Sequence, residues 1–349
     1  MSTGGKAPTM SDVAAAAGVS RSTVSLALRN SRNIPPATRS RVYAVAERLG
    51  YKTNPLVSAL MASLHKRRIT QKHTVLAYVS ADPKDAPWRG YAMFIEMHEG
   101  ASERALEMGY RLEEFALRAP GMTPRRFSQM LHARGILGLL IAPLPHGERS
   151  IELDFSEFAV VGIDMSVASP TIERVSNDHF QSALLAVEHC RALGYRRIGF
   201  AMSHEINERL EKRWLAACQL AREQFAPEDR VAPLITAESN SIITAISAWH
   251  EKQRPDVVIT GELNPNVAYP LPPAVGIVGL SLEEHSLGKI SGIFQDNRKM
   301  GAIAIEHLVA RLERGDFGPD DRGRLHLVAG QWRDGLTAPG PGKERRHLI

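Results

Sequence analysis

Apolar and polar positions alternate along the chain in two different ways. Between residues 9 and 50 the apolar residues recur at helical spacing in short segments. From residue 74 onward, short β-branched and apolar runs alternate with longer amphipathic segments. The first pattern is typical of a small helical domain, and the second of strands with helices between them. We therefore expect an N-terminal helical head followed by an α/β body.

The first two helices of the head are predicted from their end signals. Thr9 and Asp12 have the spacing of a capping box, and Gly18 can adopt the left-handed conformation that ends a helix. Ser20 is then expected to cap a second helix over residues 21–28. Two short helices joined by a turn that contains glycine are the helix-turn-helix arrangement.

A third helix is predicted to begin near Pro36, because proline is tolerated at a first helical position, and to end at Gly50. Its apolar residues follow i, i+3, i+4 and i+7 spacing; they are Val42, Val45, Ala46 and Leu49. With the apolar residues of the first two helices they would form one small shared core.

The positive charge of the chain is concentrated in this head. The protein has 349 residues and a formal net charge of +5, whereas residues 1–68 alone contain eleven Lys or Arg and two acidic residues. A basic head on a mildly acidic body is typical of a polyanion-binding module joined to a second function. Because the basic segment is also predicted to fold, we favour a DNA-binding head over a disordered basic tail.

The second helix is the candidate recognition helix. Arginine can bind a guanine edge through two hydrogen bonds, and hydroxyl side chains near a helix N-terminus suit phosphate contacts. The residues expected to contact DNA here are Ser20, Arg21, Ser22, Thr23, Ser25, Leu26, Arg29 and Asn30. The alternative is a solvent-exposed helix face in a three-helix domain without a DNA role.

The order of residues in the head resembles that of LacI/GalR-family transcription regulators. The similar runs are residues 9–14 (TMSDVA), 17–20 (AGVS), 22–25 (STVS) and 38–42 (TRSRV). The resemblance implies that Arg21 and Ser22 occupy the two leading base-reading positions. It also implies a third base-reading position at Leu26, which can make only apolar contacts.

A second DNA-contacting element is predicted directly after the head. Residues 54–62 have the pattern of a short helix with Asn54 as N-cap and Pro55 at its first position. A helix this short needs a partner to be stable in water. The resemblance implies paired hinge helices that open the minor groove with a leucine, for which Leu60 has the matching position. The alternative is a linker helix packed on the body.

The body is expected to contain parallel sheets covered by helices on both faces, divided into two lobes. Strands are predicted near residues 74–80, 136–142, 158–163, 197–202, 231–236, 256–260, 275–279 and 324–329, with another beginning at residue 110. Helices are predicted over residues 93–108, 124–134, 179–192, 206–225 and 298–314.

Ligands of such sheets bind beyond the carboxyl ends of the strands. Asp164 follows the strand predicted at residues 158–163, and Asp296 is at the end of a further predicted strand that closes at residues 293–296. Trp88 lies in the loop after the first strand, and Arg213 lies near the start of a helix. Carboxylates, a guanidinium and an aromatic ring suit a polyhydroxylated ligand. Each of these residues is also compatible with a turn or helix-cap role.

The body also resembles the LacI/GalR family, in residues 174–178 (RVSND), 193–199 (LGYRRIG) and 278–281 (VGLS). The resemblance implies a periplasmic-binding-protein-like effector domain in which Asp164, Arg213 and Asp296 bind the effector. Arg209 is a competing match for Arg213.

Residues 261–273 (GELNPNVAYPLPP) depart from the family, which has an Asn-Asp pair and a helix at this place. Proline leaves little room for that helix. We expect one customary effector contact to be absent, or to be supplied by Glu262 or Asn264.

The predicted domains are a helix-turn-helix DNA-binding domain, a hinge helix with linker, a two-lobed effector-binding and dimerisation domain, and a disordered tail. Their boundaries are residues 1–53, 54–70, 71–338 and 339–349 in that order. No apolar run is long enough to span a membrane, and the first residues lack the apolar centre of a signal peptide, so we expect a cytoplasmic protein.

Catalysis and cofactors are not expected. Two cysteines cannot build a disulfide framework, and the thirteen histidines show no spacing that suggests a metal site. The sequence contains no nucleotide-binding, serine-hydrolase or zinc-protease motif, which disfavours an enzyme.

The sequence therefore predicts a transcriptional regulator, and specifically a repressor, that binds a palindromic double-stranded DNA operator as a homodimer. A small effector, sugar-like in its chemistry, would control its DNA affinity. The alternatives are a cytosolic solute-binding protein without a regulatory role and a regulator whose pocket has lost its effector. The basic head opposes the first alternative, and residues 261–273 keep the second one open.

Overall fold

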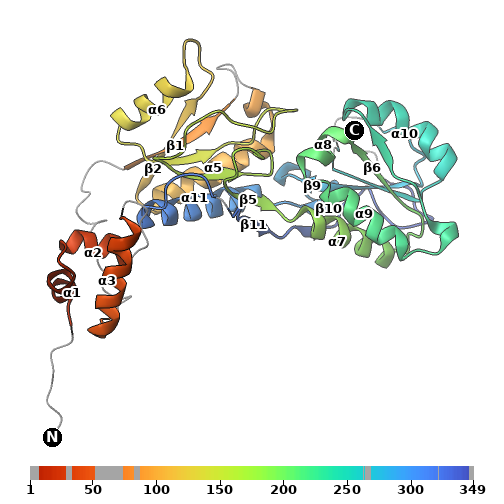
Figure 1. Ribbon diagram of the computed structural model, residues 1–349. Coiled ribbons are helices and arrows are strands. Elements are labelled where there is room, and N and C mark those ends of the chain that lie inside the picture. Colours follow the sequence, from red (N-terminus) through yellow and green to blue (C-terminus); the bar gives the residue numbers. More distant parts are fainter. Residues whose placement is uncertain are drawn as a thin grey trace, which may run out of the picture.

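The chain forms a three-helix head and a body of two α/β lobes, as predicted (Figure 1). The structure is a computed structural model. It describes residues 8–28, 34–51, 74–81, 87–261, 263, 269–320 and 322–345. The hinge helix predicted at residues 54–62 lies outside these ranges.

The head consists of α1 (Met10–Ala17), α2 (Arg21–Leu28) and α3 (Pro36–Arg48). The predicted capping box is present, since the Asp12 carboxylate accepts from the Thr9 N–H at 2.7 Å and the Thr9 hydroxyl accepts from the Asp12 N–H. Gly18 ends α1 at a φ of 62°. The three helices share one buried core, made of Val13, Ala14, Ala17, Val24, Ala27, Ile34, Val42, Val45 and Ala46.

The first lobe is a parallel six-stranded sheet with strand order β11-β5-β4-β3-β1-β2. Its strands are β1 (Thr74–Ser80), β2 (Tyr110–Ala116), β3 (Gly138–Ile141), β4 (Ala159–Ile163), β5 (Glu173–Asn177) and β11 (Leu325–Val328). Alternate residues of β1 point to opposite faces, and both faces are buried. One face packs on α5 (Ala92–Glu107) and α11 (Asn297–Arg314), and the other on α6 (Pro124–Ala133).

Helices α5 and α11 approach each other closely at two glycines. A Cβ atom added to Gly301 would lie 2.0 Å from the carbonyl oxygen of Met97, and one added to Gly100 would lie 2.0 Å from that of Arg298. Both distances are far below van der Waals contact, so this helix pair requires glycine at both positions.

The second lobe is a six-stranded sheet with strand order β12-β10-β9-β8-β6-β7, parallel except for β12. Its strands are β6 (Ile198–Ser203), β7 (Leu234–Thr236), β8 (Val257–Thr260), β9 (Gly276–Leu282), β10 (Ser291–Phe294) and β12 (Gln331–Arg333). Helices α7 (His179–Ala192) and α9 (Arg213–Glu223) cover one face, and α10 (Asn240–Gln253) covers the other. A short helix, α8 (His204–Arg209), follows β6.

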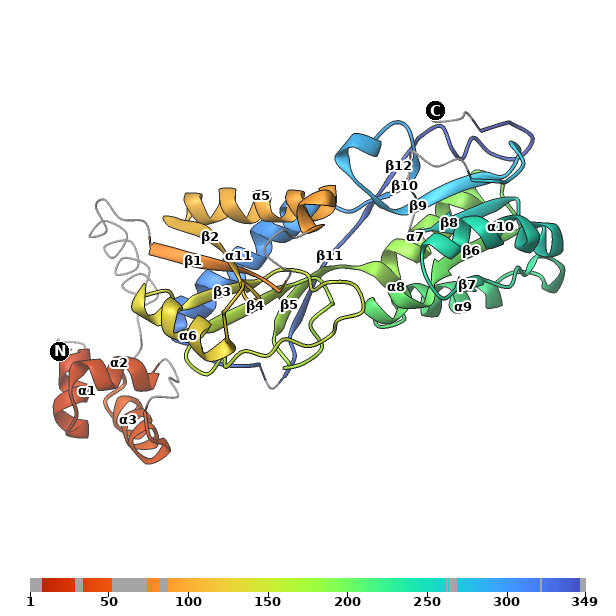
Figure 2. The same ribbon diagram turned by 90° about the horizontal axis from the view of Figure 1, so that it is seen from above.

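The chain passes from one lobe to the other between β5 and α7, between β10 and α11, and between β11 and β12 (Figure 2). Each lobe is therefore assembled from separate parts of the chain. Asparagine, aspartate and glutamine side chains stand at these crossings, where the carboxyl ends of strands from both sheets meet.

The helix predicted over residues 206–225 is wrong, because the chain forms two helices, α8 and α9, in its place. Glu211 and Lys212 separate them, with φ values of 53° and 61°. A residue in this left-handed conformation cannot continue a right-handed helix. Strands β5 and β12 and helix α10 were not predicted.

The disordered tail predicted over residues 339–349 does not hold for residues 339–345, which pack on the second lobe. The Gly340 N–H donates to the Tyr195 hydroxyl at 3.0 Å. The buried guanidinium of Arg345 donates to four backbone carbonyls, those of Tyr269, Leu271, Pro272 and Val275. These carbonyls belong to the proline-rich connection before β9. Those of Tyr269 and Pro272 also accept from the backbone N–H groups of Leu271 and Val275, so the arginine adds to the few hydrogen bonds that this irregular backbone makes within itself.

No helix in the described ranges is both long enough and apolar enough to cross a lipid bilayer.

Candidate recognition helix and interlobe site

The N-terminus of α2 is fixed by two hydroxyl side chains. The Ser20 hydroxyl accepts from the Thr23 N–H at 3.1 Å and lies 2.8 Å from the Thr23 hydroxyl. Ser20 is therefore the N-cap of α2, as predicted. At the other end, the Tyr43 hydroxyl of α3 donates to the Leu28 carbonyl at 3.3 Å. Both ends of this eight-residue helix are thus held in the head.

Helix α2 has one buried and one exposed side. Val24 and Ala27 are completely buried against α1 and α3, whereas Arg21 is exposed and Leu26 is 39% exposed. The exposed side is free of the head's own core and is accessible to a DNA groove.

Several predicted DNA contacts are outside what the structure describes. The backbones of Ser22 and Ser25 belong to α2, but their side chains lie outside the described part of the chain. Arg29, Asn30 and Leu60 lie outside it altogether.

An ion pair joins the two lobes. Asp164 directly follows β4 of the first lobe, and Arg209 is the last residue of α8 in the second lobe. The Arg209 guanidinium donates to Asp164 Oδ2 at 2.8 Å and to the Leu144 carbonyl at 2.9 Å. The side chains of the pair are 10% and 13% exposed. We call this pair the interlobe clasp.

The interlobe clasp shows which arginine faces Asp164. Arg209, which the sequence offered as the alternative to Arg213, makes the contact with Asp164. Arg213, the first residue of α9, instead lies 3.7 Å from the Glu211 carboxylate. Further contacts join the lobes beside the clasp: Arg149 donates to the carbonyls of Glu208 and Arg209 at 2.7 Å, and Arg174 pairs with Glu211 at 3.0 Å.

Backbone strain is concentrated at this junction. Asp164, Glu211 and Lys212 all have positive φ values, of 68°, 53° and 61°. Such conformations cost about 1–3 kcal/mol each in residues other than glycine and are enriched at functional sites. The ion pair between Glu211 and Arg174 of the first lobe holds part of this strained turn in place.

A buried polar network connects the first two crossings. The Asn177 amide donates to Gln295 Oε1 at 3.0 Å. The Gln295 amide donates to the Leu280 carbonyl at 2.8 Å and lies 3.4 Å from His179 Nδ1. Burial lowers the pKa of His179 to about 4, and the positive charges of Arg213 and Arg209 act in the same direction. The ring is therefore uncharged at neutral pH.

Three buried polar atoms beside this network have no hydrogen-bond partner within the described residues. They are Asn177 Oδ1, Arg213 Nε and Trp214 Nε1. The Trp214 ring packs edge-on against His179, with ring centroids 5.7 Å apart. Buried polar atoms are nearly always hydrogen-bonded in native proteins, so unpaired ones indicate a place for a polar ligand or water.

Trp88 and Asp296, two predicted effector residues, have structural partners. The Trp88 ring is 9% exposed and lies in the first-lobe core, 5.7 Å from Tyr78 and 5.6 Å from His98 between ring centroids. The Asp296 carboxylate caps α11 by accepting from the Lys299 N–H at 2.9 Å. A surface hollow of about 320 Å³ on α6 contains none of the predicted effector residues.

The proline-rich connection also meets this site. A Cβ atom on Gly261 would lie 1.8 Å from the Trp214 ring, so glycine allows the ring to pack directly on the backbone. The described residues of this segment, 261, 263 and 269–273, are not helical, as expected. Glu262 and Asn264 lie outside the described ranges.

A helix-turn-helix head joined to a two-lobed α/β body with polar residues at the lobe junction defines a class of ligand-responsive DNA-binding proteins. Residues 9–54 match the family model described as bacterial regulatory proteins, lacI family. The transcriptional regulator PtxS of Pseudomonas plecoglossicida is 31% identical over 191 residues, which cover 54% of this chain and 52% of that relative.

A longer match is to the transcriptional regulator MalR of Streptococcus pneumoniae, which is 25% identical over 86% of this chain and 97% of the relative. Two solved structures have the same fold: a transcriptional regulator CelR–cellobiose complex (TM-score 0.51, 17% identity, 94% and 98% coverage), and a Lac repressor dimer bound to operator and an anti-inducer (TM-score 0.50, 18% identity, 94% and 98% coverage). Residues 9–54 therefore match the lacI family, and the chain as a whole is similar to transcriptional regulators of that family.

Proposed function

We propose that this protein is a sequence-specific transcriptional repressor that binds a palindromic DNA operator as a homodimer. The proposal rests on the structure of α2. This helix is capped at its start, buried on one side and exposed at Arg21 and Leu26. The second helix of a helix-turn-helix enters the major groove with its first residues at the base edges. Relatives named as transcriptional regulators, which are not enzymes, support this function.

The proposed DNA contacts are those expected from the sequence. They are Ser20, Arg21, Ser22, Thr23, Ser25, Leu26, Arg29, Asn30 and Leu60. The role as a repressor is supported by the names of two similar proteins, the repressor PurR of Photobacterium profundum, 23% identical, and the Lac repressor.

We also propose that a small polyhydroxylated effector, such as a sugar, binds between the lobes and changes the affinity for DNA. The unpaired polar atoms of Asn177, Arg213 and Trp214 support this, because they lie beside the interlobe clasp and offer one acceptor and two donors. The relatives include the maltose regulon regulatory protein MalI of Escherichia coli and the CelR–cellobiose complex. Asp164, Arg213, Asp296 and Trp88 remain proposed contacts, and we add Arg209.

The interlobe clasp suggests how an effector would act. A hydroxyl group placed between Asp164 and Arg209 would donate to the carboxylate and accept from the guanidinium, which lengthens their direct contact of 2.8 Å. The lobes would then change their angle, and the change would reach the residues that follow the head. An effector shifts this balance only by the difference between its affinities for the two arrangements.

A regulator without an effector is the second candidate. The interlobe clasp favours it, because Asp164 and Arg209 already satisfy each other across the junction. The replacement of the family's helix by the proline-rich residues 261–273 also favours it.

The DNA-binding proposal is tested by selecting genomic fragments with the purified full-length protein and mapping the sites. We expect a palindromic site. The substitution Arg21→Ala should weaken binding to it by about 1–3 kcal/mol and relax the preference at one base position, measured by fluorescence anisotropy. The control is Arg48→Ala, an exposed residue at the end of α3. Equal weakening on every sequence would make Arg21 a phosphate contact, and absence of any selected site would refute the function.

The effector proposal is tested by measuring thermal unfolding of the full-length protein with a panel of mono- and disaccharides. A true effector should raise the unfolding temperature and change operator affinity, and Asp164→Asn should reduce both effects. A panel that changes neither property would favour the regulator without an effector.

A further inference from the structure

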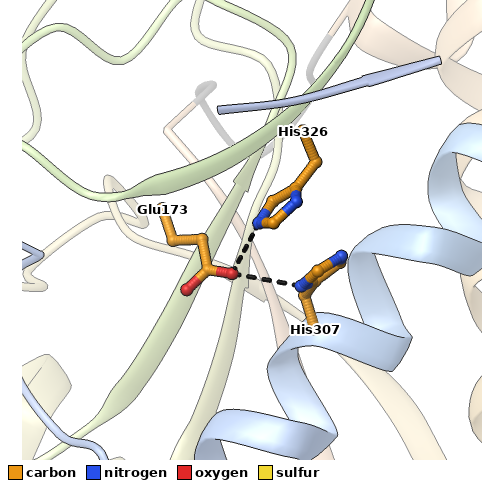
Figure 3. Close-up of side chains that lie close together, drawn as sticks. All are labelled: Glu173, His307 and His326. Atoms are coloured by element: carbon orange, nitrogen blue, oxygen red, sulfur yellow. Dashed lines mark hydrogen bonds and ion pairs between the residues drawn. The ribbon is translucent and has the colours of Figure 1, made fainter. Parts of the chain in front are cut away.

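A cluster of one glutamate and two histidines lies in the first lobe, away from the interlobe site. Glu173 begins β5, His307 lies in α11 and His326 lies in β11, and their side chains converge (Figure 3). Glu173 Oε1 lies 3.1 Å from His307 Nδ1 and 2.8 Å from His326 Nε2. These three atoms lie within 4.8 Å of one another.

We propose that Glu173, His307 and His326 bind a divalent transition-metal ion, with Zn²⁺ as the best fit. Two imidazole nitrogens and one carboxylate oxygen are a donor set that suits zinc and leaves further positions to water. Zinc bonds of 2.0–2.2 Å at tetrahedral angles place ligand atoms about 3.3 Å apart, which is close to the 3.1 and 2.8 Å that separate Glu173 Oε1 from the two ring nitrogens.

The two oxygens of Glu173 have different surroundings. Among the described residues, Oε1 pairs with the two histidines, whereas Oε2 accepts from Arg311 at 3.2 Å and forms an ion pair with Arg324 at 3.0 Å. The carboxylate is 1% exposed, so the arginines hold it in one orientation. Oε1 can therefore bind a metal without breaking the arginine contacts, which would act as outer partners that orient the ligand.

The charges around the cluster permit a cation. Arg311 and Arg324 are balanced by Asp316 and Asp320: Arg324 donates to Asp320 at 2.9 Å, and Arg311 lies 3.8 Å from Asp316. With Glu173, three carboxylates face two guanidiniums. The local charge is therefore negative, and a divalent ion would compensate it.

The histidines supply an open side. Their side chains are 32% and 33% exposed, and their rings stack with centroids 3.6 Å apart. Solvent can reach the cluster from this side and complete the coordination.

The cluster could not be predicted from sequence spacing, and the sequence analysis expected no metal site. Positions 173, 307 and 326 lie far apart in the sequence and meet only because β5 and β11 pair and α11 packs beside them. Each of the three elements leads to a lobe crossing, so a bound ion would link β5, α11 and β11 to one another within the first lobe.

The test uses the full-length protein after dialysis against a chelator. Titration calorimetry with Zn²⁺ should show one equivalent bound per chain. The variants His307→Phe and His326→Phe should each weaken binding by more than the 10–100-fold that loss of an outer partner costs. The matched control is His132→Phe, which removes a histidine paired with a single carboxylate, Glu157, at 2.8 Å.

A measurement on the unmodified protein covers the case in which a variant fails to fold. In long-range ¹H–¹⁵N spectra, Zn²⁺ should shift His307 Nδ1 and His326 Nε2 and leave His132 unchanged. The proposal is overturned if no stoichiometric binding occurs, if only one or neither of the two variants weakens it, or if the imidazole shifts occur elsewhere. The cluster would then be a structural hydrogen-bond network.

Discussion

The interlobe clasp should be a strong interaction, and its strength can be worked out from its surroundings. The substitution Arg209→Ala would remove the ion-pair partner of the Asp164 carboxylate, which is 13% exposed in the native protein. Among the described residues, the Ser166 N–H, at 2.6 Å, would remain as its close donor. It would also remove the donor to the Leu144 carbonyl.

Removing one partner of a buried ion pair costs about 3–5 kcal/mol, and a hydrogen bond to a charged group contributes about 1.5–3 kcal/mol. Because Asp164 keeps one backbone donor and some exposure, we expect Arg209→Ala to lower the free energy of unfolding by about 2–4 kcal/mol. Asp164→Asn is the matching change, since asparagine tolerates the left-handed backbone at this position.

The assay is a double-mutant cycle in urea. The wild type, Arg209→Ala, Asp164→Asn and the double variant are unfolded, and the coupling energy is taken from the four free energies. We expect about 1–3 kcal/mol. The control cycle uses Arg118 and Glu148, a pair whose side chains are 46% and 33% exposed, for which less than about 1 kcal/mol is expected.

A coupling energy for the clasp no larger than that of the exposed pair would refute this reasoning. Asp164 and Arg209 would then be neighbours without a stabilising interaction, and their proposed role in setting the lobe arrangement would have no energetic basis.

Three further predictions concern His179 at a lobe crossing, the helix pair α5–α11 and the hinge segment. The pKa of His179 is about 4 in the folded protein against an ordinary value of 6.5, so between these values only the unfolded chain gains this proton as the pH falls. The free energy of unfolding at pH 5 should therefore be about 2 kcal/mol lower than at pH 7.5. In urea titrations, His179→Gln should remove this difference. Gly301→Ala should lower the free energy of unfolding by about 1–3 kcal/mol, because its Cβ would lie 2.0 Å from the Met97 carbonyl oxygen. The control Gly90→Ala, whose Cβ would meet nothing within 4 Å, should leave the thermal unfolding nearly unchanged. Leu60→Ala should reduce DNA bending, measured by circular permutation of the operator, more than it reduces nonspecific binding; unchanged bending would reject a wedge role for this leucine.

The head was predictable because its signals are local. The capping pair Thr9–Asp12, the stop at Gly18 and the cap at Ser20 each act within one helical turn, and the structure contains all three. The alternation of strands and helices in the body was also predictable, since it depends on the period of apolar residues.

The break between α8 and α9 was not predictable in the same way. Neither Glu211 nor Lys212 is a helix breaker, and their left-handed conformation is supported by the ion pair of Glu211 with Arg174, a residue of the other lobe. This break also decides which arginine faces Asp164, so Arg209 and Arg213 could not be distinguished before the break was known.

Because the chain crosses between the lobes, the first lobe can be completed only late in synthesis. The described residues of the head, 8–28 and 34–51, come first in the chain, so the head can fold soon after synthesis. The first lobe cannot finish, because α11 (Asn297–Arg314) and the edge strand β11 (Leu325–Val328) come near the end of the chain. A nascent chain therefore has a folded DNA-binding domain long before it has a complete first lobe. A truncated product would lose regulation by the body while it still binds DNA.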